Sequence, residues 1–299
     1  MSARFYLIFL ALVIQLVAYG QPWKPYPERH KRLVQSIGFS PDGTVLYFCL
    51  MHREYLQAMG EKVDDKTPLL AIYQAQKTEE GWGNPQLLSF SGDFKDYEPT
   101  LSPDGKYLFF NSQRLVDGVP VGKLNNIWYS ELKENGWSEA RYLSEVNTIE
   151  FEESYPTITA DGKLYFVAGR EENGKLNYGL YSTQFIDGNT DGFIKELLIN
   201  DSIGSGDPWV SPDGTYIIFT KFDDSIGWSE SCDLYYSIQL RDGWSKPQPL
   251  TELNSEGPDY AVAISPDEEW IYYRKNSQFI RLPFQSILKQ MKESQPDGR

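Results

Sequence analysis

The chain has 299 residues, of which 42 are acidic, 28 are basic, two are histidine and two are cysteine. Its formal net charge of −14 repels nucleic acid and anionic membrane surfaces, so we expect no nucleic-acid partner. Two histidines and two cysteines leave little material for a disulfide framework, a histidine metal cluster or a Ser-His-Asp triad.

The first 20 residues have the pattern of a secretory signal peptide. Arg4 precedes an apolar run over residues 5–18, and the sequence Ala-Tyr-Gly then leads to a cleavage point before Gln21. The run is short for a bilayer span, and no later segment approaches the ~20 apolar residues of a transmembrane helix. We therefore expect a secreted or periplasmic protein without membrane insertion.

A turn motif recurs five times along the chain. Ser-Pro-Asp-Gly and its variants occupy residues 40–43, 102–105, 159–162, 211–214 and 265–268. In such a turn proline presets φ, aspartate accepts a local hydrogen bond and glycine adopts a positive φ. Each turn follows a short apolar strand and precedes a β-rich run, at residues 45–48, 107–110, 164–167, 216–219 and 270–273. Each copy therefore predicts a β-hairpin.

Two more strands complete each repeat. A third strand ends in an aromatic segment, at residues 72–73, 127–130, 180–182, 234–237 and, more weakly, 279–280. A fourth begins with glycine and an aromatic residue, at residues 81–82, 136–137, 192–193 and 243–244. Four antiparallel strands per repeat predict the blade of a β-propeller.

The last repeat lacks a fourth strand of its own, and the N-terminal segment can supply it. Trp23 lies 17 residues before Ser40, close to the spacing of 18 to 22 residues in the internal copies. Pairing there would close the ring and remove two exposed sheet edges. The fold prediction is an all-β, single closed propeller of five four-stranded blades over residues 21–285, with six blades as the alternative count and a polar tail over residues 286–299.

The combination of Ser-Pro-Asp-Gly-x-x-Leu-Tyr-Phe, Ile/Leu-Tyr-x-Ser and Gly-Trp resembles the WD40-like, TolB-type propeller repeat, and it covers essentially the whole chain after residue 20. The resemblance implies a propeller found in envelope binding modules, accessory domains of peptidases and some polysaccharide-active enzymes. It does not extend to TolB itself, which would imply an extra N-terminal domain and six blades.

Acidic and aromatic residues recur in the loops that lead into the innermost strands, which we call the inner-strand loops. Loops that share one face of the ring would bring them together over the central channel, opposite arginines that follow the second strands. The candidate ligand-binding residues are Asp96, Tyr97, Glu98, Glu153, Tyr155, Asp207, Asp259, Arg114 and Arg170. The alternative is structural, with each acid capping backbone amides or pairing with an arginine. We expect little concave surface on the opposite, turn face.

One loop has the spacing of a calcium site. Asp187, Asn189 and Asp191 match the start of a calcium-binding loop, and their oxygens are suited to a hard cation. The twelfth position is Leu198 and not glutamate, and the same residues favour a hairpin turn without metal. Calcium is the one candidate cofactor.

No nucleophile elbow, zinc-protease pair, phosphate loop or dinucleotide fingerprint is present in the sequence. The leading hypothesis is a monomeric, non-catalytic binding module for a protein, a peptide or a glycan. The first alternative is a glycan-active hydrolase or lyase that uses channel carboxylates as acid and as base or nucleophile. The second is a purely structural scaffold.

Overall fold

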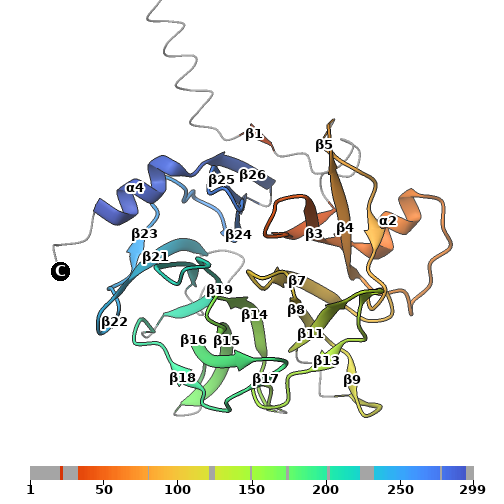
Figure 1. The fold of residues 1–299 in the computed structure, drawn as a ribbon, viewed down its shortest axis with the longest axis horizontal. Helices are drawn as coiled ribbons and strands as arrows, with labels where there is room; N and C mark the ends of the chain where they lie inside the picture. Colours follow the sequence, from red (N-terminus) through yellow and green to blue (C-terminus); the bar gives the residue numbers. More distant parts are fainter. Residues whose placement is uncertain are drawn as a thin grey trace, which may run out of the picture.

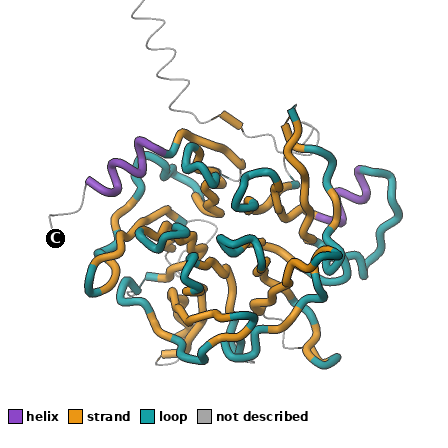
Figure 2. The backbone as a smooth tube through the Cα atoms, viewed as in Figure 1, coloured by secondary structure: helices purple, strands orange, loops and turns teal. Residues whose placement is uncertain are grey.

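The computed structural model describes residues 21–22, 33–79, 81–120, 125–148, 150–172, 175–200, 203–222, 232–276 and 278–293. Five antiparallel sheets surround a central axis, and the innermost strand of each faces that axis (Figure 1). Figure 2 shows that the two described helices lie at the periphery of the ring. The predicted all-β propeller with five blades is confirmed.

The first two blades run outwards from the axis in chain order. The first contains β2 (Val34–Phe39), β3 (Val45–Met51), β4 (Leu70–Thr78), β5 (Gly81–Trp82) and β6 (Gln86–Leu87), with helix α2 (His52–Ala58) after β3. The second contains β7 (Asp96–Leu101), β8 (Tyr107–Ser112), β11 (Asn126–Lys133), β12 (Gly136–Trp137) and β13 (Arg141–Tyr142), with a small hairpin of β9 (Leu115–Val116) and β10 (Val119–Pro120). The fourth strand of each blade thus consists of two short pieces.

The other three blades repeat this order. The third contains β14 (Glu153–Ile158), β15 (Lys163–Glu172), β16 (Lys175–Ile186), β17 (Asn189–Thr190) and β18 (Lys195–Glu196). The fourth contains β19 (Gly204–Val210), β20 (Tyr216–Phe222), β21 (Asp233–Leu240), β22 (Gly243–Trp244) and β23 (Gln248–Pro249). The fifth contains β24 (Asp259–Ile264), β25 (Trp270–Lys275) and β26 (Gln278–Pro283), followed by helix α4 (Gln285–Glu293).

The ring closes through the N-terminal segment, as predicted. Strand β1 (Gln21–Pro22) pairs antiparallel with β26, with Gln21 opposite Arg281 and Pro22 opposite Ile280. It takes the place that a fourth strand has in the other blades, so the edge of β26 is covered there. Trp23, on which the spacing argument rested, lies outside the described residues, as does the predicted signal peptide.

The five turns share one hydrogen-bonding arrangement. In the first, the Ser40 hydroxyl donates to Asp42 Oδ1 at 2.6 Å and accepts the N–H of Val45 at 2.8 Å. The corresponding Ser or Thr hydroxyl donates to aspartate in every other copy. Gly43 has a φ of 67°, which favours glycine, whereas the fifth copy places Glu268 there with a φ of 54°.

Hydrophobic clusters between neighbouring blades form the core. Phe48 of the first blade shares one cluster with Tyr272 of the fifth, and Phe109 of the second shares another with Phe166 of the third. Helix α4 buries Leu288 and its neighbours in the cluster of the fourth and fifth blades. Each such side chain contributes on the order of 1.5–3 kcal/mol when fully buried, so inter-blade packing holds the channel walls in place.

Asparagines after the fourth strand fasten the connection to the next blade. Asn254 accepts the N–H of Leu234 at 2.9 Å and donates to its carbonyl at 3.1 Å. Asn147 and Asn200 make the same pair of bonds in their own blades. The inner-strand loops that follow are therefore anchored at their starts. Among the described helices, none has the length and apolar character needed to cross a membrane.

Candidate functional site

Each innermost strand carries a register irregularity where it lines the central axis. The residues at this point in the second, third and fourth blades are Glu98, Tyr155 and Asp207, with φ of 53°, 53° and 50°. Ala261 holds this position in the fifth blade, with a φ of 56°, whereas in the first blade the irregularity lies between Val34 and Ser36, and Ser36 is the residue that lines the cavity. A bulge re-aims a side chain, and a left-handed conformation is costly for residues with a Cβ. Such backbone strain is typical of functional sites.

A cavity of about 510 Å³ extends along the axis from these five residues towards the turns. The prolines of four turns line it at the other end, namely Pro41, Pro103, Pro212 and Pro266. The expectation that the turn face has little concave surface is therefore wrong. That expectation treated each turn as flat, whereas five turns arranged in a ring enclose a common space.

The walls between the two ends are apolar and rigid. Pro99, Pro156 and Pro208 follow the bulged residues directly, and the side chains of Phe39 and Trp209 also line the cavity. Proline has a fixed φ and no N–H, so these strand segments present no unpaired donor to the cavity. Four carboxyl groups and no lysine, arginine or histidine occur among the described lining residues. The cavity is thus acidic at both ends.

Glu98 and Asp207 form the acidic base of the cavity. Burial raises the pKa of Glu98 well above its usual value, and the Asp207 carboxylate raises it further, against the effects of Ser36 and Arg274. Burial also raises the pKa of Asp207 to about 6. Asp207 Oδ2 accepts the N–H of Ala261 at 2.9 Å. Both acids therefore hold protons at higher pH than ordinary carboxyl groups, which is common in functional sites.

Glu268 lies at the turn end of the cavity. It is the only one of the five turns' fourth residues that is not glycine, and its left-handed φ of 54° carries a cost that glycine would avoid. Its Oε1 accepts a hydrogen bond from the hydroxyl of Tyr216 at 3.0 Å. The exchange of glycine for glutamate therefore adds a carboxylate to the cavity at the expense of backbone strain.

Asp96 is not among the residues that line the cavity and belongs to a buried network of hydrogen bonds. Its oxygens accept the hydroxyls of Ser91 at 2.8 Å and Ser112 at 2.6 Å, and the guanidinium of Arg114 lies 2.7 Å away. Arg114 also donates to the carbonyl of Phe90 and lies against four aromatic rings. Burial raises the pKa of Asp96 to about 6 although these donors oppose the shift. This network ties the second blade to the loop from the first.

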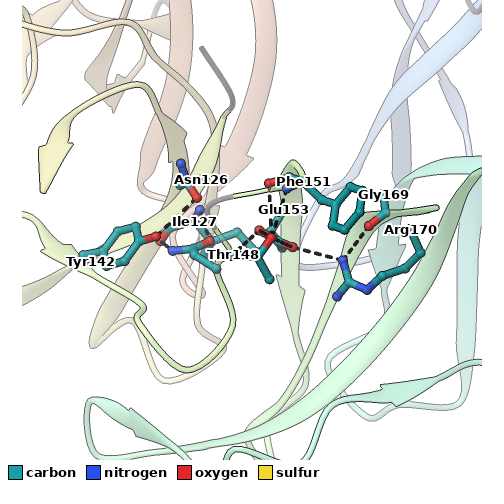
Figure 3. Close-up of polar contacts among 9 residues, drawn as sticks. Asn126, Ile127, Tyr142, Thr148, Phe151, Glu153, Gly169 and Arg170 are labelled. Atoms are coloured by element: carbon teal, nitrogen blue, oxygen red, sulfur yellow. Dashed lines mark hydrogen bonds and ion pairs between the residues drawn. The ribbon is translucent and has the colours of Figure 1, made fainter. Parts of the chain in front are cut away.

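Glu153 is the first residue of β14, as Asp96 is of β7, and Figure 3 shows it beside Thr148 and Arg170. It accepts the N–H of Thr148 at 2.7 Å and pairs with Arg170 at 3.1 Å, and its side chain has no exposed surface. The guanidinium of Arg170 also donates to the carbonyl of Gly169 at 2.6 Å and lies 4.9 Å from the ring centroid of Tyr181. Burial raises the pKa of Glu153, and the Thr148 amide is the largest influence that lowers it.

Asp259 and Tyr97 also lie in the framework around the cavity. Asp259 accepts the N–H of Ser255 at 2.5 Å and its hydroxyl at 2.9 Å, which anchors the loop from the fourth blade. Tyr97 is 8 % exposed, and the ammonium of Lys95 lies 4.6 Å from its ring centroid. Of the predicted ligand-binding residues, the structure therefore brings Glu98, Tyr155 and Asp207 together at the cavity.

The predicted calcium loop forms a hairpin between β16 and β17. Asp187 and Gly188 both have positive φ, as expected for a tight hairpin turn. Asp191 Oδ1 accepts the hydroxyl of Thr183 at 2.9 Å and the N–H of Phe193 at 3.0 Å. Asp187 Oδ1 lies 3.5 Å from the ammonium of Lys106. Two of the three predicted calcium ligands, Asp187 and Asp191, therefore contact other protein groups in the structure. Calcium binding stays a prediction.

Sequence reasoning missed Ser36, Glu268 and Phe39 as cavity residues. A signal for the bulge was present, because proline occurs three residues before the Ser or Thr of the turn in three consecutive repeats. Proline inside an inner strand indicates a bulge or an interrupted ladder. The residues before these prolines, Glu98, Tyr155 and Asp207, are all left-handed residues of the cavity.

No family model matches the chain. The uncharacterized protein Atu1656 of Agrobacterium fabrum is 26% identical over 203 residues, which cover 65% of this chain and 53% of that protein. The chain thus spans about half the length of this curated relative. It also spans 32% of the chain of a prolyl endopeptidase structure, at 13% identity and a TM-score of 0.46.

Two solved structures of similar length share the fold. The endo-arabinase of Bacteroides thetaiotaomicron is 13% identical with a TM-score of 0.51, and the match covers 88% of this chain and 97% of that one. The α-L-arabinofuranosidase of Lactobacillus brevis is 14% identical with a TM-score of 0.52, and the match covers 84% and 91%. Together with the sheet topology, these comparisons show that the chain is a five-bladed β-propeller.

Proposed function

We propose that the protein is an exported, non-catalytic binding module that takes part of a protein, peptide or glycan ligand into its central cavity from the turn face. The observation that carries the proposal is the placement of two carboxyl groups and a tyrosine, those of Glu98, Asp207 and Tyr155, at the base of a cavity of about 510 Å³. Ala261 shares this left-handed backbone, so the features that support a ligand are the two carboxyl groups and the tyrosine at this level of the cavity.

Size and chemistry of the cavity support a ligand site. Its volume falls within the range of about 300–1,000 Å³ that is typical of small-molecule and side-chain pockets. Apolar walls with a few polar groups at the base are also typical of such sites. Rigid prolines keep the walls in place, so that little ordering is needed when a ligand enters.

One observation favours a second candidate, a glycan-active hydrolase. Glu98 and Asp207 are two carboxyl groups with raised pKa in one cavity, and glycoside hydrolysis requires one acid that still holds its proton and one that does not. Two proteins that share the fold are an endo-arabinase and an arabinofuranosidase, which makes arabinan the first substrate to test.

The experiment compares binding with turnover on the same samples. Purified protein is titrated by calorimetry with arabinan and xylan oligosaccharides and with a peptide panel, and reducing ends are assayed in parallel. Glu98→Gln combined with Asp207→Asn removes both charges with little change of volume, and Glu134→Gln in the exposed hairpin between β11 and β12 is the matched control.

Each outcome decides between the candidates. Saturable binding without product, lost in the double variant and kept in the control, supports the binding module. Product release that is lost in the double variant establishes the hydrolase instead. Binding that survives in the double variant places the ligand elsewhere, and no binding on any panel member contradicts the proposal.

A further inference from the structure

We infer that the base of the cavity accepts a protonated primary amine on a slender aliphatic stem, held between Glu98 and Asp207 with the Ser36 hydroxyl as a third partner. The inference rests on the proposed function and names the ligand chemistry of the same cavity. An ammonium group of this kind occurs in a lysine side chain of a protein partner and in a free polyamine.

The charge of the cavity is the first argument. Four carboxyl groups line it and no basic residue does, within the described part of the chain. Asp213 caps its own turn, where its Oδ1 accepts the hydroxyls of Ser211 at 2.7 Å and Thr215 at 2.8 Å, and Glu268 accepts Tyr216. Glu98 and Asp207 are left to compensate a ligand charge.

The groups that face this acid pair leave it short of positive charge. Within the described part of the chain, Arg274 is the one basic residue whose charge lowers the pKa of Glu98. Its guanidinium donates to the carbonyl of Val34 at 2.8 Å and lies 5.5 Å from the ring centroid of Tyr260. The tyrosines and cysteines around the pair are neutral when protonated, and burial raises the pKa of each of them. One guanidinium is therefore available to balance the charge of two carboxyl groups. A cation bound between Glu98 and Asp207 would favour the ionised form of both.

Hydrogen-bonding capacity is the second argument. The N–H of Ala261 is the one donor to Asp207 among the described residues, and it uses Oδ2. The hydroxyl of Ser36 is 3 % exposed and has no partner of normal hydrogen-bond geometry, although it lies close enough to lower the pKa of Glu98. An unpartnered buried polar group is costly. An ammonium has three donors and no acceptor, which matches two carboxylates and a hydroxyl.

The walls indicate what carries the amine. Between the acid pair and the turns, the lining is mostly apolar and includes prolines, aliphatic residues, Phe39 and Trp209. Methylene groups pack well against such walls, in the way that lysine buries its stem beside a charged head group. A guanidinium needs a wider planar fork of acceptors. The described residues also include no group of three acidic, histidine or cysteine side chains suited to a metal ion, which favours an organic cation.

The test uses three small probes at pH 8, measured by calorimetry or by NMR titration. They are N-acetyl-lysine methylamide, its norleucine counterpart, which lacks the charge, and spermidine. We expect the two amines to bind saturably and the norleucine compound to bind about tenfold more weakly or worse. Glu98→Gln with Asp207→Asn should weaken amine binding by a similar factor, Ser36→Ala should weaken it less, and Glu134→Gln should leave it unchanged. The lysine compound and spermidine together show which source of the amine fits better.

Different outcomes of this experiment would contradict the amine site and the proposed function. Equal binding of the lysine and norleucine compounds, or full affinity in the double variant, overturns the amine site. If no amine binds but a neutral oligosaccharide does, and the double variant loses it, the cavity remains the ligand site and only the amine assignment fails. If neither class binds, both fail.

Discussion

Replacement of Asp207 by asparagine should make the protein more stable at neutral pH. Burial raises the pKa of Asp207 from 3.8 to about 6, so the folded protein holds this group in an unfavourable charged form at pH 7. Asparagine has nearly the same shape, and its carbonyl oxygen can still accept the N–H of Ala261. The change thus removes a buried charge and keeps the hydrogen bond.

The magnitude follows from the pKa shift. One pKa unit corresponds to about 1.4 kcal/mol, so a shift from 3.8 to about 6 makes the ionised group cost about 3 kcal/mol at pH 7. Because the folded pKa is the higher one, the stabilising effect of protonation is complete below pH ~3.8 and is lost as pH rises towards 6. Asparagine does not ionise, so the Asp207→Asn variant does not lose this stability as the pH rises. Its free energy of unfolding should exceed that of the unmodified protein by about 3 kcal/mol at pH 7, and the two should be equal near pH 3.5.

Urea unfolding of both proteins at several pH values measures the difference in the free energy of unfolding. The comparison holds when this free energy depends on urea concentration with the same slope in both proteins. The same variant should bind the amine probes more weakly, so that stability rises while binding falls. This trade-off is expected of a residue retained for function. If Asp207→Asn lowers the free energy of unfolding at pH 7, the carboxylate is a structural bridge and the reasoning is refuted.

Four further predictions follow. Asp96→Asn should destabilise the protein by up to about 2 kcal/mol in urea at pH 7, because leaving Arg114 without its partner costs about 3–5 kcal/mol, whereas removal of the buried charge recovers about 3 kcal/mol; a more stable variant would contradict this. Deletion of residues 1–32 should uncover the edge of β26 and increase aggregation in light scattering, and unchanged solubility and melting would count against ring closure. Calcium binding at the β16–β17 hairpin predicts a higher melting temperature in calcium than in chelator, and Asp191→Ala should abolish the difference; equal melting temperatures would rule it out. Amine binding should weaken as pH falls through 6, because protonated Asp207 offers less charge, and a flat pH profile would refute that role.

The blade architecture could be predicted because its determinants are local. A turn of Ser-Pro-Asp-Gly fixes a hairpin from four residues, and its recurrence gives the number of blades. Ring closure was also predictable, since an unpaired edge in the last blade and an unassigned strand at the start of the chain suit each other. The hydrogen bonds of Ser40 with Asp42 and Val45 supply the detail behind the pattern.

The site was harder to predict because bulges break the alternation of side chains. Asp96 and Glu98 are two residues apart, so a regular strand would place them on the same face. The irregularity between Tyr97 and Thr100 instead leaves Asp96 beside Arg114 and Glu98 at the cavity. A bulge depends on pairing with a distant strand, so sequence spacing alone does not give its position. Sequence reasoning therefore grouped framework acids with cavity acids.

The five blades repeat the same strands and turns, but the residues that they contribute to the cavity differ. This difference determines how the binding properties of the cavity can change in evolution. Each blade contributes one residue at the level of the bulge: Ser36, Glu98, Tyr155, Asp207 and Ala261. A substitution at one of these residues changes the part of the cavity wall that one blade supplies and leaves the other four blades unchanged. The two acids come from blades that are not adjacent, so a bound molecule would have one preferred rotational setting. Selectivity in this scaffold can thus evolve by single substitutions, sector by sector, without a new fold.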